Sequence, residues 1–181
     1  LINNAGVIGQ RDAIIGNIDY EQWEETFRIN TLGPIRVAEA LAENVAASEK
    51  KVIVFISSIM GSISQNGGGH YLYRSTKAAL NNAMVSLSMD LASRGVVCVS
   101  IHPGWVRTDM GGDSAPLDAR TSASGLKKVM LGIDAAHKLA ILASLAFGTQ
   151  ISFEEVETRG IREIEAVDIE RAAALGYRIR L

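Results

Sequence analysis

The residues best suited to chemistry in this sequence are Tyr73 and Lys77, which lie four positions apart. In a helix, this spacing puts both side chains on one face, one turn apart. A nearby ammonium stabilises a phenolate, so we expect Lys77 to lower the pKa of Tyr73 from its usual value of about 10. Such a phenol can donate a proton to a carbonyl oxygen or accept one from an alcohol. On spacing alone, two neighbours on a solvated helix are the simpler interpretation.

Ser58 is the second candidate, because its hydroxyl could bind the same substrate oxygen as Tyr73. It follows an apolar run and is separated from Tyr73 by a glycine-rich loop. Two neighbours compete for these roles. Ser57 could be the functional serine, whereas Tyr71 is the weaker tyrosine because Ser75, and not a lysine, lies four residues after it.

Three polar motifs each follow an apolar run of the kind that forms strands. They are Asn3 to Gly6 after residues 1–2, Ser57-Ser58 after residues 52–56, and Pro103-Gly104 after residues 96–101. In open parallel sheets, ligands bind beyond the carboxyl ends of the strands. We therefore expect the three motifs to meet at one edge of a sheet, with Tyr73 and Lys77 on the helix beside it.

Helical patterns separate these strands. Asp19 followed by Gln22 indicates a capped helix start, and Gly33-Pro34 should bend or restart that helix. A second helix begins near Tyr71 and ends at Gly95. Strands that alternate with long helices predict an α/β fold. We expect a partial doubly wound parallel sheet of Rossmann-like type, and because the chain opens on what looks like the end of a strand, we expect its first strands to be missing.

Composition limits the classes of function. The 181 residues are 48% hydrophobic and 21% charged, which is typical of a soluble globular protein. The net charge of −2 argues against a nucleic-acid partner. The longest apolar run, residues 139–147, is too short to span a bilayer, so we expect a cytoplasmic protein without a membrane partner. One cysteine and three scattered histidines predict neither a disulfide framework nor a metal site.

Taken as an ordered set, the motifs of residues 1–131 resemble the short-chain dehydrogenase/reductase family. The set consists of Asn3-Asn4-Ala5-Gly6, Asn30, Ser58, Tyr73 with Lys77, and Pro103-Gly104 with Thr108. Residues 71–81 and 102–112 are most similar to the carbonyl reductase branch that includes sniffer and C-signal. The resemblance implies an NAD(P)-dependent oxidoreductase that interconverts a carbonyl and an alcohol on a small-molecule substrate.

The resemblance also implies a role for each catalytic residue. Tyr73 would be the general acid/base, and Lys77 would lower its pKa and hold the cofactor ribose. Ser58 would orient the substrate oxygen. Asn30 would hold a water that links Lys77 to solvent, although a plain helix cap is an alternative for it. In the family, the helices that carry Asn30 and Tyr73 build a dimer interface, so we expect a homo-oligomer.

The cofactor cleft would be lined by residues that follow the strands. These are Asn4, Ala5, Gly6, Pro103, Gly104 and Thr108, the last of which would contact the nicotinamide end. Thr108 could instead be a helix N-cap. The family's glycine-rich cofactor turn and the charged residue that selects NAD or NADP do not appear in this sequence. We therefore expect the chain as written to bind dinucleotide weakly, and its cofactor preference stays open.

The last fifty residues or so follow a different pattern. Residues 132–181 resemble a segment of the catalytic domain of homoserine dehydrogenases, and we expect an unrelated α+β segment there. In that likeness Asp134 and Lys138 would serve the substrate site, whereas the alternative is a surface ion pair at i,i+4. We predict two domains, 1–131 and 132–181, joined near Leu131, and a chimeric chain. Three functions stay open: the carbonyl–alcohol enzyme, a homoserine-related activity, or an inactive fragment that retains a dimerisation surface.

Overall fold

The computed structural model describes residues 1–130. The predicted second site at Asp134 and Lys138 lies outside the described residues. The chain divides into two compact units, Leu1–Leu117 and Asp118–Leu181. The first unit holds the sheet and its helices, and the described part of the second contains helix α5 (Ala119–Met130). The predicted boundary near Leu131 therefore differs from the division in the structure, which falls after Leu117.

The first unit is built on a three-stranded parallel sheet of order β1-β2-β3. Its strands are β1 (Ile2–Asn3), β2 (Val52–Ile56) and β3 (Val97–Ile101). Ile2 lies opposite Val54, and β2 pairs with β3 along its whole length, from Val52 opposite Val97 to Ile56 opposite Ile101. The prediction of an α/β fold with a parallel sheet is confirmed.

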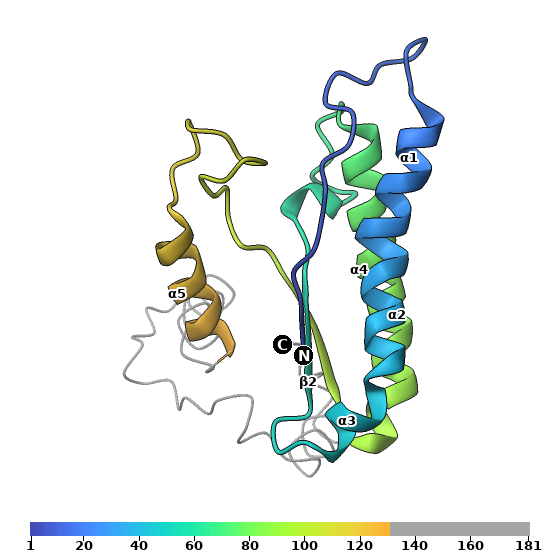
Figure 1. Ribbon diagram of the computed structural model, residues 1–181, viewed down its shortest axis with the longest axis vertical. Helices are drawn as coiled ribbons and strands as arrows, with labels where there is room; N and C mark the ends of the chain where they lie inside the picture. The colour runs from blue at the N-terminus through green and yellow to red at the C-terminus, as the bar shows by residue number, and fades with distance from the viewer. Residues whose placement is uncertain (131–181) are drawn as a thin grey trace, which may run out of the picture. The chain divides into compact units, whose positions relative to one another are not determined.

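Helices connect the strands and cover one face of the sheet (Figure 1). Between β1 and β2 come α1 (Tyr20–Phe27), the π-helical η1 (Arg28–Leu32), α2 (Gly33–Ala40) and α3 (Ala42–Ala47). Between β2 and β3 come the 3₁₀ turn η2 (Ile59–Gly61), the long helix α4 (Tyr71–Leu91) and the 3₁₀ turn η3 (Ala92–Arg94).

Helix starts and breaks follow the predicted signals. The Asp19 side chain accepts a hydrogen bond from the Gln22 N–H at 2.9 Å and caps α1. The predicted break at Gly33-Pro34 takes the form of η1, where the Gly33 N–H donates to the carbonyl of Arg28, five residues before it. Proline has no N–H, so Pro34 cannot donate to the carbonyl four residues before it, and the regular ladder is interrupted there.

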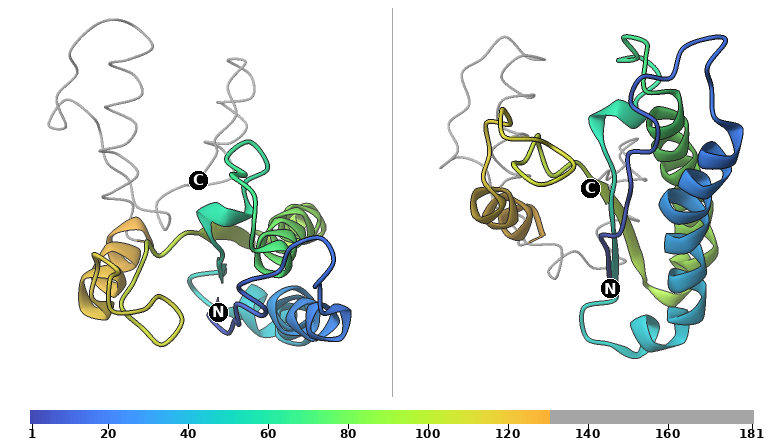
Figure 2. Two further views of the ribbon diagram at one scale, coloured as in Figure 1. Left: turned by 90° about the horizontal axis from the view of Figure 1, so that it is seen from above. Right: turned by 45° about the horizontal axis from the view of Figure 1, so that its top comes forward.

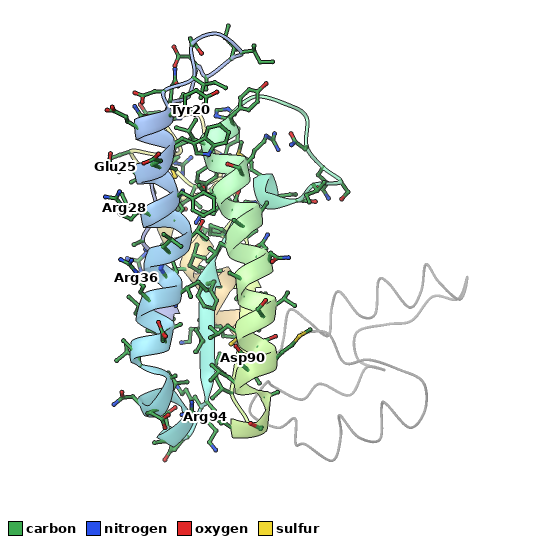
Figure 3. All side chains as sticks on the ribbon, turned by 90° about the vertical axis from the view of Figure 1, so that its right-hand side faces the viewer. Tyr20, Glu25, Arg28, Arg36, Asp90 and Arg94 are labelled. Atoms are coloured by element: carbon green, nitrogen blue, oxygen red, sulfur yellow. The ribbon has the colours of Figure 1, made fainter. Side chains whose placement is uncertain are left out.

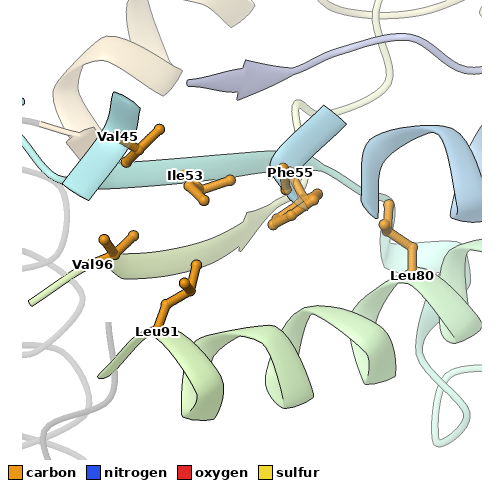
Figure 4. Packing of buried hydrophobic residues seen from close by; sticks show 7 residues of the cluster. Val45, Ile53, Phe55, Leu80, Leu91 and Val96 are labelled. Atoms are coloured by element: carbon orange, nitrogen blue, oxygen red, sulfur yellow. The ribbon is translucent and has the colours of Figure 1, made fainter. Parts of the chain in front are cut away.

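The hydrophobic core lies between the sheet and these helices. Ile53 and Phe55 of β2 are fully buried. They pack with residues from α2, α3, α4 and the approach to β3, namely Ala38, Val45, Leu80, Leu91 and Val96 (Figure 4). The sequence predicts that β2 and β3 are both buried, and this is correct only for β2. Ser100 of β3 is exposed because β3 pairs with β2 along one edge only in the described sheet.

The loops that follow the three strands leave the sheet at the same end, the upper end in Figure 1 and the end nearer the viewer in the left panel of Figure 2. They are residues 4–19, 57–70 and 102–117. This is the edge at which the sequence predicts a site. Among the helices within residues 1–130, none has both the length and the hydropathy that a membrane span requires.

Candidate active site

Tyr73 and Ser58 meet at the carboxyl end of β2, where they share a side-chain hydrogen bond. Ser58 follows the strand closely and caps η2, because its Oγ accepts a hydrogen bond from the Met60 N–H at 3.1 Å. Tyr73 lies in the first turn of α4. Ser57 is buried, and its hydroxyl has no partner among the described residues. The structure therefore brings Ser58, rather than Ser57, to the tyrosine.

Lys77 lies one helical turn after Tyr73 and is buried, with only 3% of the residue exposed. Its Nζ donates to the carbonyl of Ile56, the last residue of β2, at 2.9 Å. The same Nζ lies over the Tyr73 ring, 5.7 Å from its centre. The loop after β1 also comes close, because a Cβ built at Gly6 would lie 3.4 Å from the Lys77 Nζ. One lysine therefore joins three elements of the site.

Burial sets the pKa values of both groups. Burial raises the pKa of Tyr73, and the hydrogen bond with Ser58 lowers it by a smaller amount. Burial lowers the pKa of Lys77 from 10.5 to about 8. The prediction that Lys77 lowers the pKa of Tyr73 is wrong for this structure, because desolvation outweighs every favourable contact of the phenol. The Lys77 ammonium is directed at a backbone carbonyl instead.

Asn30 is fully buried inside η1, and its amide makes three hydrogen bonds. Its Oδ1 accepts from the Val7 N–H at 2.8 Å, and its Nδ2 donates to the Val7 carbonyl at 2.7 Å. Nδ2 also donates to Thr76 Oγ1 at 3.1 Å. Asn30 is therefore not a helix cap, and its role in holding a relay water stays a prediction. It ties the loop after β1 to α4.

Thr31 and Thr76 complete this polar layer and were missed by the sequence reasoning. The Thr31 Oγ1 donates to the Thr76 carbonyl at 2.9 Å, and Thr76 is fully buried beside Lys77. A signal for Thr76 does exist in the sequence. It lies at i+4 from Leu72 and i−4 from Leu80, so helical periodicity puts it on the buried face of α4.

A family model described as short chain dehydrogenase matches residues 1–117, which is most of the chain and all of the first unit. The chain belongs to the short-chain dehydrogenase family. A curated member, C-signal of Myxococcus xanthus, is 46% identical over 138 residues, which cover 76% of this chain and 82% of that protein.

Solved structures of short-chain dehydrogenases match the same region. The carbonyl reductase Sniffer of D. melanogaster is 41% identical with a TM-score of 0.67, and the match covers 70% of this chain and 56% of that one. A short-chain dehydrogenase/reductase from Burkholderia multivorans with bound NADP is 36% identical with a TM-score of 0.65, covering 70% and 55%. The chain thus spans little more than half of these solved proteins.

A second family model, homoserine dehydrogenase, matches residues 130–181. This segment agrees in position with the predicted likeness of residues 132–181, and almost all of it lies outside the described residues. Within residues 1–130, no group of three or more His, Cys, Asp or Glu side chains could hold a metal ion.

The remaining residues that the family resemblance assigns to the cofactor lie along the same sheet edge. Asn4 and Ala5 are exposed directly after β1, and Pro103 and Gly104 are half-buried after β3. Thr108 is exposed, and its Oγ1 accepts from the Gly111 N–H at 3.1 Å. Thr108 therefore caps a turn in the loop after β3. The alternative, a helix N-cap, does not apply, because no helix begins after Thr108 in this loop.

Two polar side chains of this short-chain dehydrogenase are buried, which the sequence motifs do not predict. The Asn3 Nδ2 and the Ser57 Oγ are buried at the ends of β1 and β2, without a partner among the described residues. Tyr71, the competing tyrosine, is partly exposed and packs edge-on against Trp23, with ring centres 6.4 Å apart. The ring contact of Tyr71 is thus with Trp23 of α1, whereas the tyrosine with a hydrogen bond to Ser58 is Tyr73.

Proposed function

We propose that this short-chain dehydrogenase is an NAD(P)-dependent oxidoreductase that interconverts a carbonyl and an alcohol on a small molecule, with Tyr73 as the general acid/base. One observation carries the proposal, namely the hydrogen bond between Tyr73 and Ser58 above a buried Lys77 at the carboxyl edge of the sheet. Two hydroxyls next to each other can both bind one substrate oxygen. The solved relatives named carbonyl reductases support this reaction class.

The residues at the edge fit the nicotinamide and ribose part of NAD(P). An ammonium group has three hydrogens, and the Lys77 Nζ donates one of them to the Ile56 carbonyl. The other two can donate to the hydroxyls of a ribose. Gly6 leaves space above Lys77 that a Cβ would fill. Asn4, Ala5, Pro103, Gly104 and Thr108 would line the rest of the cleft. When bound, the cofactor supplies or accepts the hydride, and the chain provides orientation and the proton.

In this proposal Ser58 donates a hydrogen bond to the substrate oxygen and Tyr73 transfers the proton. Because burial raises the pKa of Tyr73, the phenol stays protonated at neutral pH. A protonated phenol is the form that donates to a carbonyl oxygen, so the environment favours the reductive direction. Lys77, with its pKa lowered to about 8, carries its charge at neutral pH and can replace the proton.

Asn30 acts in this proposal through its backbone as well as its amide. Its two amide hydrogens go to Val7 and Thr76, so a relay water would bind to an oxygen of Asn30, and we assign it to the backbone carbonyl. Pro34, four residues later, has no N–H to give to that carbonyl. This supports a water on the carbonyl that supplies protons to Lys77.

The decisive experiment replaces Tyr73→Phe in the full chain and follows NADPH oxidation with a panel of aldehydes and ketones. Loss of the proton donor should reduce turnover by about 10²- to 10⁴-fold, while circular dichroism and the melting temperature stay close to those of the parent. Tyr71→Phe is the matched control and should keep its activity. Full turnover by Tyr73→Phe would refute the assignment of the acid/base.

We also propose that a second copy of the chain pairs through the outer side of the helices that carry Asn30 and Tyr73 (Figure 3). Large apolar side chains of these helices are exposed, namely Leu32 of η1, Val37 of α2, Leu41 at the end of α2, and Val85 and Met89 of α4. A hollow of about 300 Å³ between α1 and α4 adds apolar surface, and Tyr20, Trp23 and Phe27 line it. Exposed apolar patches of this kind are typical of protein interfaces.

Analytical ultracentrifugation tests this pairing. We expect a dimer for the parent chain and a monomer for Met89→Lys, whereas Ile63→Lys, which changes an exposed isoleucine of the loop after η2, should stay dimeric. A monomeric parent would contradict the pairing. A dimer that neither binds NADPH nor turns over a carbonyl would favour the inactive fragment with a dimerisation surface.

The match of residues 130–181 raises homoserine dehydrogenase activity as a second candidate. Asp134 and Lys138 would carry its substrate roles. The acidic substrate-binding stretch that precedes such residues in that family does not appear in this sequence. We therefore expect no NAD(P)-dependent rate with homoserine, and a rate lost in Lys138→Ala would overturn this expectation.

A further inference from the structure

Two loops at the candidate site are joined by a contact that the catalytic proposal does not use. The Arg11 Nη2, in the loop after β1, donates to the carbonyl of Met110, in the loop after β3, at 2.7 Å. The two residues are 99 positions apart in the sequence. We propose that Arg11 is a positioning residue that holds the loop of residues 105–117 at the mouth of the active site. Its effect on turnover rests on the proposed function, whereas the contact itself can be tested alone.

The Arg11 side of this contact is anchored by local hydrogen bonds. Gln10 Nε2 donates to the Asn17 carbonyl at 3.0 Å, and the Asp19 N–H donates to Gln10 Oε1 at 3.0 Å. Asn17 Nδ2 donates to the Asp12 carbonyl at 3.1 Å. Side chains that bond to the backbone on both sides of Arg11 fix the loop that carries it, and Asp19 connects this loop to the start of α1.

The loop of residues 105–117 is braced from within. At its base, the Arg107 N–H donates to the Leu117 carbonyl at 2.7 Å, and the Leu117 N–H donates to the Trp105 carbonyl at 3.2 Å. At its tip, the Gly112 N–H donates to the Thr108 carbonyl at 2.8 Å. These bonds connect the loop from base to tip. A contact at Met110, next to the Thr108–Gly112 turn, therefore holds the tip more directly than a contact at the base would.

The loop carries two groups, Trp105 and Thr108, that follow β3 at the carboxyl edge of the sheet. Trp105 is 55% exposed, and its Nε1 donates to the Gly111 carbonyl at 2.8 Å, so its ring moves with the tip. Thr108, the residue assigned to the nicotinamide end, lies in the same turn. Holding Met110 therefore holds both groups at the edge where Tyr73 and Ser58 lie. The donor in the Arg11–Met110 bond is charged, which strengthens the bond, but the bond is exposed to water, which weakens it again.

Hydrogen exchange on the full chain tests the contact without any activity. If Arg11 holds the tip, Arg11→Ala should speed exchange of the Gly111 and Gly112 amides by roughly threefold to tenfold, the range for one net hydrogen bond. Arg11→Lys, which can still donate to a carbonyl, should restore part of the protection. The β2 amides should not change. Lys50→Ala, which removes an exposed cation at the opposite end of the sheet, is the control and should leave the tip unchanged.

Equal exchange at Gly111 and Gly112 in the parent and in Arg11→Ala would overturn the proposal. Steady-state kinetics give the second readout. In a chain that turns over a carbonyl substrate, Arg11→Ala should raise KM by about the same factor and leave kcat nearly unchanged, since Tyr73 and Ser58 are untouched. A chain with no turnover but with faster tip exchange would reject the proposed function and keep the role of Arg11.

Discussion

The floor and the rim of the candidate site are held by hydrogen bonds of different kinds. The floor, defined as Asn30, Thr31, Thr76 and Lys77, is buried, and its side chains bond to one another and to the backbone of other elements. The rim, defined as the loops of residues 62–70 and 105–117, has hydrogen bonds within each loop, and an arginine from outside each loop donates to one of its carbonyls. These arginines are Arg74, whose Nε donates to Gly68 at 3.1 Å, and Arg11.

This difference has an energetic consequence. Leaving a buried donor or acceptor without a partner costs about 1–3 kcal/mol, because water cannot replace the lost contact. A group near the surface regains a water when its partner is removed. The floor should therefore fix the position of the reacting groups, whereas the rim should adjust around different substrates. The following predictions test this division, from the largest expected effect to the smallest.

Asn30→Ala should have the largest effect, because it leaves the Val7 N–H and the Val7 carbonyl without their partner. It also removes the bond that the Thr76 hydroxyl accepts, although that hydroxyl still donates to the Tyr73 carbonyl. We expect a loss of about 3 kcal/mol in the free energy of unfolding, measured by urea denaturation. Asn82→Ala, which changes an exposed asparagine of α4, is the control and should stay within about 0.5 kcal/mol of the parent. Equal losses in the two variants would contradict the division between floor and rim.

Lys77 makes the floor sensitive to pH. Its pKa is about 8 in the folded chain and 10.5 in the unfolded reference, so between these values the unfolded state binds more protons. Stability should therefore rise from pH 8 to pH 10, by about 1–2 kcal/mol. Above pH 10 the raised pKa of Tyr73 acts in the opposite direction, because the unfolded tyrosine loses its proton first.

Denaturant titrations at several pH values measure this rise, with Lys77→Met as the matched variant. Lys77→Met also loses the bond to Ile56, so its free energy of unfolding differs from that of the parent at every pH. The quantity to compare is therefore how steeply the free energy of unfolding changes with pH. The parent should gain stability relative to Lys77→Met across the window. Parallel curves would mean that Lys77 is solvated in the folded chain.

The sequence predicts the meeting of the reacting groups and two floor residues, Asn30 and Lys77, but it reveals neither Thr31 and Thr76 nor how the floor is bonded. The types and spacing of Tyr73, Lys77 and Ser58, together with the strands before them, predict that they meet at one edge. The Asn30 amide bonds to Val7, a residue of the β1 loop without any motif of its own, and a contact 23 positions apart has no local signal. The direction of the Tyr73 pKa shift depends on burial by the whole fold, which spacing alone does not reveal.

The rim was predicted least well, for a physical reason. Exposed arginines are common, and nothing in the sequence near Arg11 or Met110 distinguishes this pair from other partners. Their contact depends on how two long loops fold back at the sheet edge. Local turn chemistry predicts that loops occur at these positions, but it does not predict which loop residues meet.

Thr31→Val is the milder test of the floor. It keeps the shape of the side chain and removes the bond from the Thr31 hydroxyl to the Thr76 carbonyl. Because α4 continues through Thr76, its carbonyl can keep a helical partner. We expect a loss of about 1 kcal/mol, read from the urea midpoint. A loss as large as that of Asn30→Ala would mean that the two contacts act as one unit.

Arg74→Ala should have the smallest effect on stability, within about 0.5 kcal/mol, because the Gly68 carbonyl that it contacts is exposed and can bond to water instead. Its effect should appear in the loop, where residues 62–70 carry three glycines and an exposed isoleucine. Limited proteolysis should cut this loop faster in Arg74→Ala than in the parent, while Arg74→Lys keeps part of the resistance. A destabilisation comparable to that of Asn30→Ala would place Arg74 among the floor residues, because a loss of that size requires a buried partner left unpaired.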